Sequence, residues 1–177
     1  MLSDTPLSVC SFSLTLFGGF SGTRPVAEIE GMSWPVVVRN IAPTDVPAIA
    51  PQKEIMPYAV PCALKVAPLV GKTLEAAITR GWPTVAKMRS ASHVTASAIL
   101  KYDIDGCSAA QWDAARSRLE GSGATFLAYS THSHGREDKP GYRVRVWVPM
   151  DRALEQAEYE RAWKAAADWL FGEVFHD

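Results

Sequence analysis

The 177-residue sequence lacks the features that would place it in several common protein classes. It has only three cysteines, Cys10, Cys62 and Cys107, and no two of them have the spacing of a zinc-binding pair. A disulfide framework or a zinc ribbon is therefore not expected, and a reducing cytoplasm fits this cysteine usage best. No apolar run approaches the roughly 18 to 20 residues of a membrane span, so we expect no membrane contact.

The sequence also lacks an excess of charge of either sign. It has 18 basic and 19 acidic residues and a formal net charge of −1. Overall charge therefore gives no attraction to phosphates, and any contact with nucleic acid requires a local basic patch. The first residues have no basic segment, so we expect a strand there and no signal peptide. With 47% hydrophobic and 21% charged residues, the composition is that of a folded globular domain.

Two parts of the chain differ in their patterns. Residues 1–95 are rich in proline, alanine and valine and show only loose periodicity. Within them we predict a strand in residues 8–17 and a short helix over 74–81, ended by Gly81. From residue 96 the periodicity becomes regular. We therefore predict an N-terminal α/β extension over 1–95 that packs on a core over 96–177, the two forming one compact domain.

The second part has the pattern strand–helix–strand–strand–helix. The helix after the first strand carries a capping-box pattern, Ser108 and Gln111. The predicted elements are a strand at 96–105, a helix at 108–121, strands at 124–132 and 142–149, and a helix at about 153–171. This β-α-β-β-α order is most of a split βαβ unit, so the predicted fold class is α+β with a ferredoxin-like or RRM-like sheet. In such a unit the first and third strands are neighbours, and the two helices cover one face.

The uncovered face of this predicted sheet carries charge. Lys101, Asp103 and Asp105 alternate along the first strand, and Arg143 and Arg145 alternate along the third. Two adjacent carboxylates repel each other unless a cation lies between them, and Mg²⁺ is held by one or two carboxylates with water and phosphates. Guanidinium groups fit phosphate oxygens. The pattern therefore predicts a metal and polyphosphate site on this face.

Three further residues of the strands are expected on the same face. Ser130 and His132, on the strand predicted at 124–132, can donate hydrogen bonds to the same phosphates. Trp147 follows Arg145 by two positions. It either stacks on a base, as aromatic residues do on open RNA-binding sheets, or packs against the N-terminal region.

The runs KYDIDG, YSTHSH and YRVRVWVPMDR, followed by a helix containing a tyrosine, resemble the archaeo-eukaryotic primase superfamily, in particular its phage and plasmid primase–polymerase branch. That family has an Asp-x-Asp or Asp-x-Glu motif, a Ser-x-His motif and a third acidic residue on a later strand. The resemblance covers about residues 85–177. It implies catalytic residues Asp103, Asp105 and His132, two Mg²⁺ or Mn²⁺ ions held by Asp103 and Asp105, and nucleotide contacts from Ser130, His132, Arg143 and Arg145.

The third carboxylate is where the sequence departs from this family. It should follow the long helix, where Asp177 is the candidate metal ligand. Asp151 is the alternative, although its place just before the predicted helix suits an N-cap. Arg89 and Lys87 precede the acidic strand, and they either reach the nucleotide phosphates or lie in a solvated loop.

The function implied by the resemblance is metal-dependent synthesis of primers or DNA from nucleoside triphosphates on a single-stranded DNA template. The setting is phage or plasmid replication, with a replicative helicase as a further partner. Two alternatives stay open. A non-catalytic primase-like domain would be a replication accessory or a nucleic-acid-binding module. A rolling-circle or relaxase endonuclease would use His132 and His134 with Tyr159 as nucleophile, and would leave Asp103 and Asp105 without a task.

Overall fold

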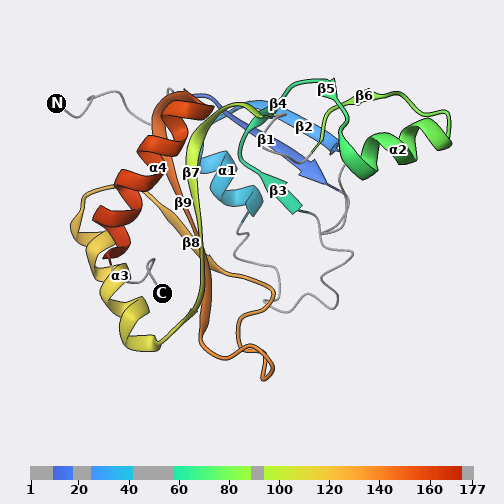
Figure 1. Cartoon of the computed structure of the whole chain (residues 1–177). Helices are drawn as coiled ribbons and strands as arrows, with labels where there is room; N and C mark the ends of the chain where they lie inside the picture. Colours follow the sequence, from blue (N-terminus) through green and yellow to red (C-terminus); the bar gives the residue numbers. More distant parts are fainter. Residues whose placement is uncertain (1–9, 18–24, 42–57, 89–93, 173–177) are drawn as a thin grey trace.

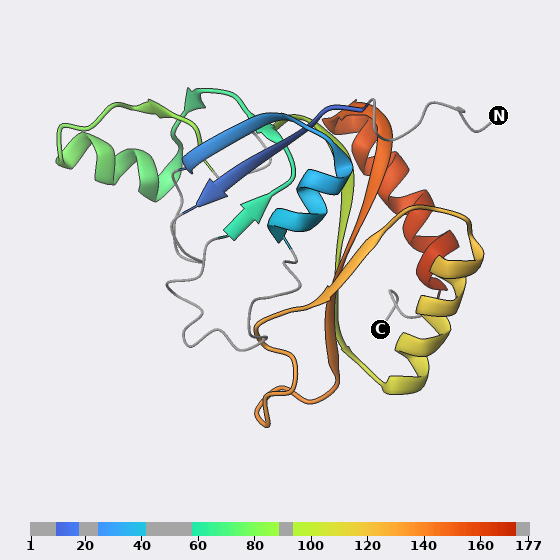
Figure 2. The same ribbon diagram turned by 180° about the vertical axis from the view of Figure 1, so that it is seen from behind.

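The computed structural model describes residues 10–17, 25–41, 58–88 and 94–172, which together form an α+β fold (Figures 1 and 2). Its centre is an antiparallel four-stranded sheet with the order β4-β7-β9-β8. The strands are β4 at Ala63–Leu64, β7 at Val94–Cys107, β8 at Leu127–Ser130 and β9 at Tyr142–Glu155. The predicted first and third strands, β7 and β9, are neighbours, and both are longer than predicted.

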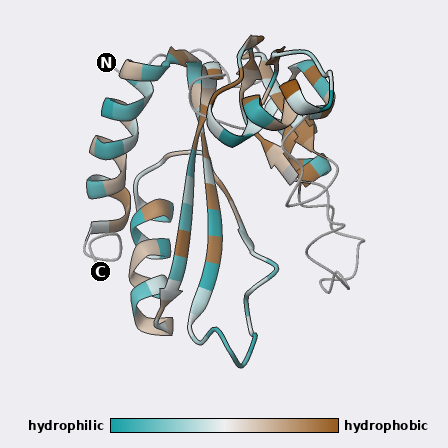
Figure 3. Ribbon diagram, turned by 45° about the vertical axis from the view of Figure 1, so that its right-hand side comes forward, coloured by the Kyte–Doolittle hydropathy of each residue, from teal (hydrophilic) through white to brown (hydrophobic). Residues whose placement is uncertain are grey.

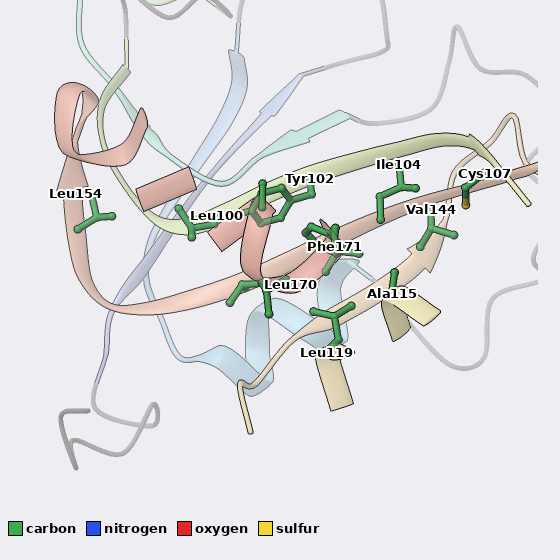
Figure 4. Close-up of a cluster of buried hydrophobic side chains, with 13 residues drawn as sticks. Leu100, Tyr102, Ile104, Cys107, Ala115, Leu119, Val144, Leu154, Leu170 and Phe171 are labelled. Carbon is green, nitrogen blue, oxygen red and sulfur yellow. The ribbon is translucent and has the colours of Figure 1, made fainter. Parts of the chain in front are cut away.

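Two helices, α3 (Ala109–Gly121) and α4 (Gln156–Phe171), lie on one face of this sheet (Figure 1). The apolar residues that alternate along β7 and β9 point to these helices and form the main core (Figure 4). Tyr102 lies at its centre, edge-on to Phe171 and stacked on Trp163. The core contains Leu100, Tyr102, Ile104, Cys107, Ala115, Leu119, Val144, Val146, Val148, Leu154, Ala167, Leu170 and Phe171.

Helix α3 begins as the sequence predicts. The Ser108 hydroxyl accepts a hydrogen bond from the Gln111 amide at 3.2 Å, and the Gln111 side chain accepts one from the Ser108 amide at 2.8 Å. Both bonds satisfy amides that the first helical turn leaves without an intrahelical partner. The capping box therefore fixes where β7 ends and α3 starts.

The Ser108→Ala substitution is expected to lower the free energy of unfolding by about 1 kcal/mol, because the Gln111 amide loses its acceptor. Ser117, exposed within α3, is the matched control. Ser117→Ala should leave stability unchanged or slightly higher, since alanine is the better helix former. Urea unfolding followed by circular dichroism measures both. Equal losses for the two variants would contradict the capping role.

The start of α4 differs from the prediction. Strand β9 continues to Glu155, and its last residues pair with the beginning of β7, Ala96 with Glu155 and Ser97 with Leu154. Asp151 therefore lies within the strand, and its interpretation as a helix N-cap is wrong. The N-cap position is Glu155, whose side chain makes no capping hydrogen bond.

The N-terminal region packs on the other face of the central sheet (Figure 2). Strands β1 (Phe12–Phe17), β2 (Pro25–Met32) and β3 (Tyr58–Val60) form an antiparallel sheet of order β2-β1-β3, and helix α1 (Trp34–Ile41) follows β2. Of the strand predicted in residues 8–17, the part from Phe12 to Phe17 is confirmed as β1, whereas residues 8 and 9 lie outside the described residues. A second core joins this region to the central sheet, with members Phe12, Leu14, Met32, Trp34, Val37, Ala98, Ile99 and Trp147. The domain division between residues 95 and 96 stays a prediction.

Trp147 is fully buried in this second core. Its indole ring packs among residues of β1 and α1 and meets the Tyr129 ring edge-on at a centroid distance of 6.2 Å. Of the two predictions for Trp147, packing against the N-terminal region is therefore confirmed and base stacking is wrong.

A small unit projects from the molecule on the side away from α3 and α4 (Figure 1). It consists of β5 (Ala67–Pro68), α2 (Gly71–Thr79) and β6 (Val85–Ala86), and β5 pairs with β6. The short helix predicted at 74–81 is this α2, which begins three residues earlier. No helix in the described ranges has both the length and the apolar content to cross a membrane.

Candidate functional site

The candidate site lies on the face of the central sheet opposite α3 and α4. The register of β7 and β9 pairs Asp103 with Arg145 and Asp105 with Arg143. Because alternate residues of a strand share a face, these four side chains and Lys101 lie on one side of the sheet, here named the charged face. The polar positions alternate with apolar ones along both strands in Figure 3. The predicted common face of the two aspartates and two arginines is therefore present.

Ion pairs connect these residues across the two strands. The Arg143 guanidinium lies 3.0 Å from an Asp105 carboxylate oxygen, and Arg145 donates a hydrogen bond to Asp103. The Lys101 ammonium is 3.6 Å from the other Asp103 oxygen. Each aspartate thus has a cationic partner, and three cations face two carboxylates.

The cations and the carboxylates differ in exposure. The side chains of Lys101, Arg143 and Arg145 are only 15–19% exposed, whereas those of Asp103 and Asp105 are 43% and 59% exposed. The stems of the long cationic side chains cover the sheet. The carboxylates therefore present oxygen atoms to solvent above a layer of positive charge.

Ser130 does not lie with this group. Strand β8 pairs Ser130 with Val144 and Tyr129 with Arg145. Val144 belongs to the core under α3 and α4, so Ser130 occupies a register position of the helix-covered face. The prediction that Ser130 shares the face of Asp103 is therefore wrong. The physical reason is that Phe126 and Ala128, which precede Ser130 by four and two residues and so point to the same side, pack against the core under α3 and α4.

The same register reveals a site residue that sequence reasoning missed. Tyr129, the register partner of Arg145, lies on the charged face and also touches Trp147. No sequence signal identifies it, because β8 is apolar on both sides: Ala128 packs towards the helices, while Leu127 and Tyr129 pack against the core containing Trp147.

His132 lies beyond the end of β8, in a turn over residues 132–135, and not on a strand as predicted. The turn is held to the start of β9 because the Thr131 amide donates to the Arg143 carbonyl at 2.9 Å and the Arg143 amide donates to His134 Nδ1 at 3.1 Å. The Nδ1 atom of His132 and the Nε atom of Arg143 are both buried, and neither has a hydrogen-bond partner in the described ranges. The turn and Arg143 therefore hold two buried polar groups whose hydrogen-bonding capacity is not used.

The geometry expected for a relaxase is not present. The Tyr159 hydroxyl accepts a hydrogen bond from the Lys101 amide at 3.2 Å, and burial raises the pKa of Tyr159. Lys101 pairs with Trp147 of β9, whereas His134 is bound to Arg143 of the same strand. Trp147 and Arg143 are four residues apart. Four residues of strand span about 13 Å. Tyr159 also belongs to α4, on the opposite face of the sheet from the aspartates, so the structure does not bring it together with the His-x-His pair.

The two aspartates fit one kind of metal site. In the described parts of the chain, no group of three or more His, Cys, Asp or Glu side chains is arranged to hold a metal ion. Asp103 and Asp105 suit a cation such as Mg²⁺, which takes one or two carboxylates and completes its shell with water and substrate phosphates. Asp177 and Arg89, the predicted third ligand and a predicted phosphate contact, lie outside the described residues.

A family model described as the VapE N-terminal domain matches residues 83–177, slightly more than half of the chain. The chain belongs to the VapE N-terminal domain family. This family is associated with phage and plasmid replication. The matched segment contains β7, β8, β9, α3 and α4, and so includes every described residue of the charged face. No curated protein and no solved structure matches the chain.

Proposed function

We propose that this VapE N-terminal domain acts in phage or plasmid replication as a metal-dependent nucleotidyltransferase of the primase–polymerase type. The observation that carries the proposal is the pairing of Asp103 and Asp105 with Arg145 and Arg143 on one sheet face, with the carboxylates on the solvent side. A carboxylate pair beside two guanidinium groups is what a divalent cation and a triphosphate require together. The β7-β9-β8 order with both helices on one face supports the ferredoxin-like interpretation of the fold.

The ion pairs of Asp103 with Arg145 and Asp105 with Arg143 are compatible with this function, because each charged group can exchange its partner for a new one of opposite charge. A nucleoside triphosphate offers phosphate oxygens to Arg143 and Arg145, and Asp103 and Asp105, released from the arginines, would hold its accompanying cation. The cost of separating Asp103 from Arg145 is then offset by two new charge-assisted contacts. The ion pairs seen across β7 and β9 keep the arginines in place for this exchange.

In this proposal the two aspartates and the two arginines of the charged face have separate tasks. Asp103 and Asp105 hold Mg²⁺ or Mn²⁺, which supplies charge neutralisation and alignment to the phosphates. Arg143 and Arg145 bind the triphosphate, and His132 reaches it from the adjoining turn. The 3′-hydroxyl of the growing strand attacks the α-phosphate and pyrophosphate leaves, a reaction that depends mainly on positioning and charge stabilisation. Asp177 and Arg89 keep the roles of third ligand and phosphate contact, whereas Ser130 has no role.

Nucleotide incorporation by the 177-residue chain tests the proposal. The chain is incubated with a single-stranded DNA template, with and without a primer, and with labelled ribo- or deoxynucleoside triphosphates in Mg²⁺ or Mn²⁺. We expect template-dependent products that disappear when the metal is chelated. The absence of product under all these conditions would contradict a nucleotidyltransferase.

A second candidate is a non-catalytic domain that binds nucleotides or nucleic acid. The observation that favours it is that both aspartates already have cationic partners, while Ser130 belongs to the other face. Equilibrium binding of labelled triphosphate, measured beside incorporation, separates the two candidates. Tight binding without turnover supports the non-catalytic domain, and turnover excludes it.

A further inference from the structure

The segment from Lys65 to Lys87, which contains β5, α2 and β6 and is here named the basic arm, differs in charge from the rest of the chain. It contains four basic residues, Lys65, Lys72, Arg80 and Lys87, and one acidic residue, Glu75. Four minus one gives the arm a net charge of +3 in a chain whose net charge is −1. The arm therefore carries a local excess of positive charge, which nucleic-acid contact requires in a chain of this overall charge.

The basic arm also exposes apolar side chains. The described chain has ten exposed large hydrophobic residues, and five of them belong to this arm: Val66, Val70, Ile78, Trp82 and Val85. Trp82 is 45% exposed, and the Arg80 guanidinium lies over its ring, 4.8 Å from the centroid. An arginine stacked on an exposed indole presents a flat surface with positive charge beside it.

The arm has a structure of its own and is tied to the rest of the molecule. Leu69, Ala77 and Met88 form a small core beneath α2, and the Leu69 amide donates to the Thr84 carbonyl at 2.8 Å. The ion pair between Lys87 and Glu28 connects the arm to β2. The arm projects on the side of the central sheet away from α3 and α4, which is the side of Asp103 and Asp105 (Figure 1).

We propose that the basic arm binds single-stranded nucleic acid, with Lys65, Lys72 and Arg80 contacting phosphates and Trp82 stacking on a base. Charge complementarity favours this partner, since a nucleic acid strand is a polyanion. Proteins that bind single strands combine a positive surface with aromatic stacking. Exposed valines alone would equally suit a lipid surface or a protein, but the Arg80–Trp82 stack, in a segment that also carries Lys65 and Lys72, matches phosphates and planar bases. That this strand is the template rests on the proposed function, whereas its binding to the arm does not.

Fluorescence anisotropy with a labelled thymidine oligonucleotide tests the proposal on the full chain. The variant Lys65→Gln/Lys72→Gln/Arg80→Gln is compared with Arg116→Gln/Arg161→Gln/Lys164→Gln, which removes the same charge from exposed positions of α3 and α4. We expect the arm variant to bind at least about ten-fold more weakly and its salt slope to fall by about 2, since single strands contribute about 0.7 per neutralised phosphate. The helix variant should bind within about two-fold of the unmodified chain. Equal losses in both variants, or no loss in the arm variant, would overturn the proposal.

Trp82 provides an independent measurement. Trp82→Ala should weaken binding about ten-fold with little change in salt slope, and Trp82→Phe should retain most of the affinity, because stacking is carried by the ring. Equal affinities for Trp82→Ala and the unmodified chain would overturn the stacking contact. Anionic vesicles are the comparison ligand, and binding to vesicles without binding to the oligonucleotide would overturn the partner assignment. Oligonucleotide binding is measured without nucleotide or divalent cation, so failure of the catalytic proposal leaves this result unaffected.

Discussion

Replacing Asp103 and Asp105 together by asparagine is expected to reduce metal-dependent nucleotide incorporation by about 1,000-fold, or about 4 kcal/mol of transition-state stabilisation. Asparagine has nearly the same shape as aspartate but carries no charge, and it is a weak ligand for a hard divalent cation. Both carboxylates lie on the solvent side of their ion pairs, so both are available to such an ion. The measurement is labelled-nucleotide incorporation at saturating metal and template. A double variant that still incorporates nucleotide would show that these two residues do not hold the catalytic metal.

Two controls separate loss of catalysis from loss of structure. The double substitution leaves Lys101, Arg143 and Arg145 without their carboxylate partners, which itself lowers stability when cations are largely buried. Thermal unfolding of the variant must therefore show that it is folded at the assay temperature. The variant Asp113→Asn/Glu155→Gln makes the same change of charge at exposed positions, and it should incorporate nucleotide at the unmodified rate.

The sequence was sufficient to predict the charged face because long strands with one buried side have an unambiguous pattern. In β7 and β9, buried apolar residues alternate with Asp103, Asp105, Arg143 and Arg145, so a single register puts all four on the same side. The Ser108 capping box likewise predicts the start of α3, because its two hydrogen bonds join residues only three positions apart. Both features depend on local or strictly periodic interactions.

Strand β8 shows where this reasoning fails. Its sequence is apolar on both sides, since Ala128 packs towards α3 and α4 while Leu127 and Tyr129 pack towards the core of Trp147. Alternation alone cannot then decide which side faces the helices, and the prediction for Ser130 is wrong for this reason. Pairing with β9 decides it, and that pairing is a contact between distant parts of the chain.

The extension of β9 to Glu155 was not predictable for a similar reason. Residues 150–155 have no strand-like alternation, and their conformation follows from pairing with Ala96 and Ser97 at the beginning of β7. In the sheet β2-β1-β3, the pairing of β1 with β3 also joins segments far apart in sequence. In this sheet, only β1 is predicted from the alternation of its own residues.

Trp147→Ala is expected to lower the free energy of unfolding by about 3–5 kcal/mol, the usual range for removing a large aromatic side chain from a core. Trp147 is fully buried between the central sheet and the N-terminal region, where β1 and α1 residues surround it. The cavity left by alanine would lie at the junction of the two regions. Urea unfolding followed by far-ultraviolet circular dichroism measures the loss without relying on tryptophan fluorescence.

Two further substitutions show whether the burial of Trp147 is the cause. Trp169 on α4 is 62% exposed, so Trp169→Ala should change stability by less than about 0.5 kcal/mol. Trp147→Phe should cost much less than alanine, because it keeps a ring in the core and removes an indole N–H that is buried without a partner in the described ranges. Similar losses for the alanine variants of Trp147 and Trp169 would contradict the packing. A large loss confined to Trp147 would mean that the strand carrying Arg143 and Arg145 depends on the N-terminal region for its stability.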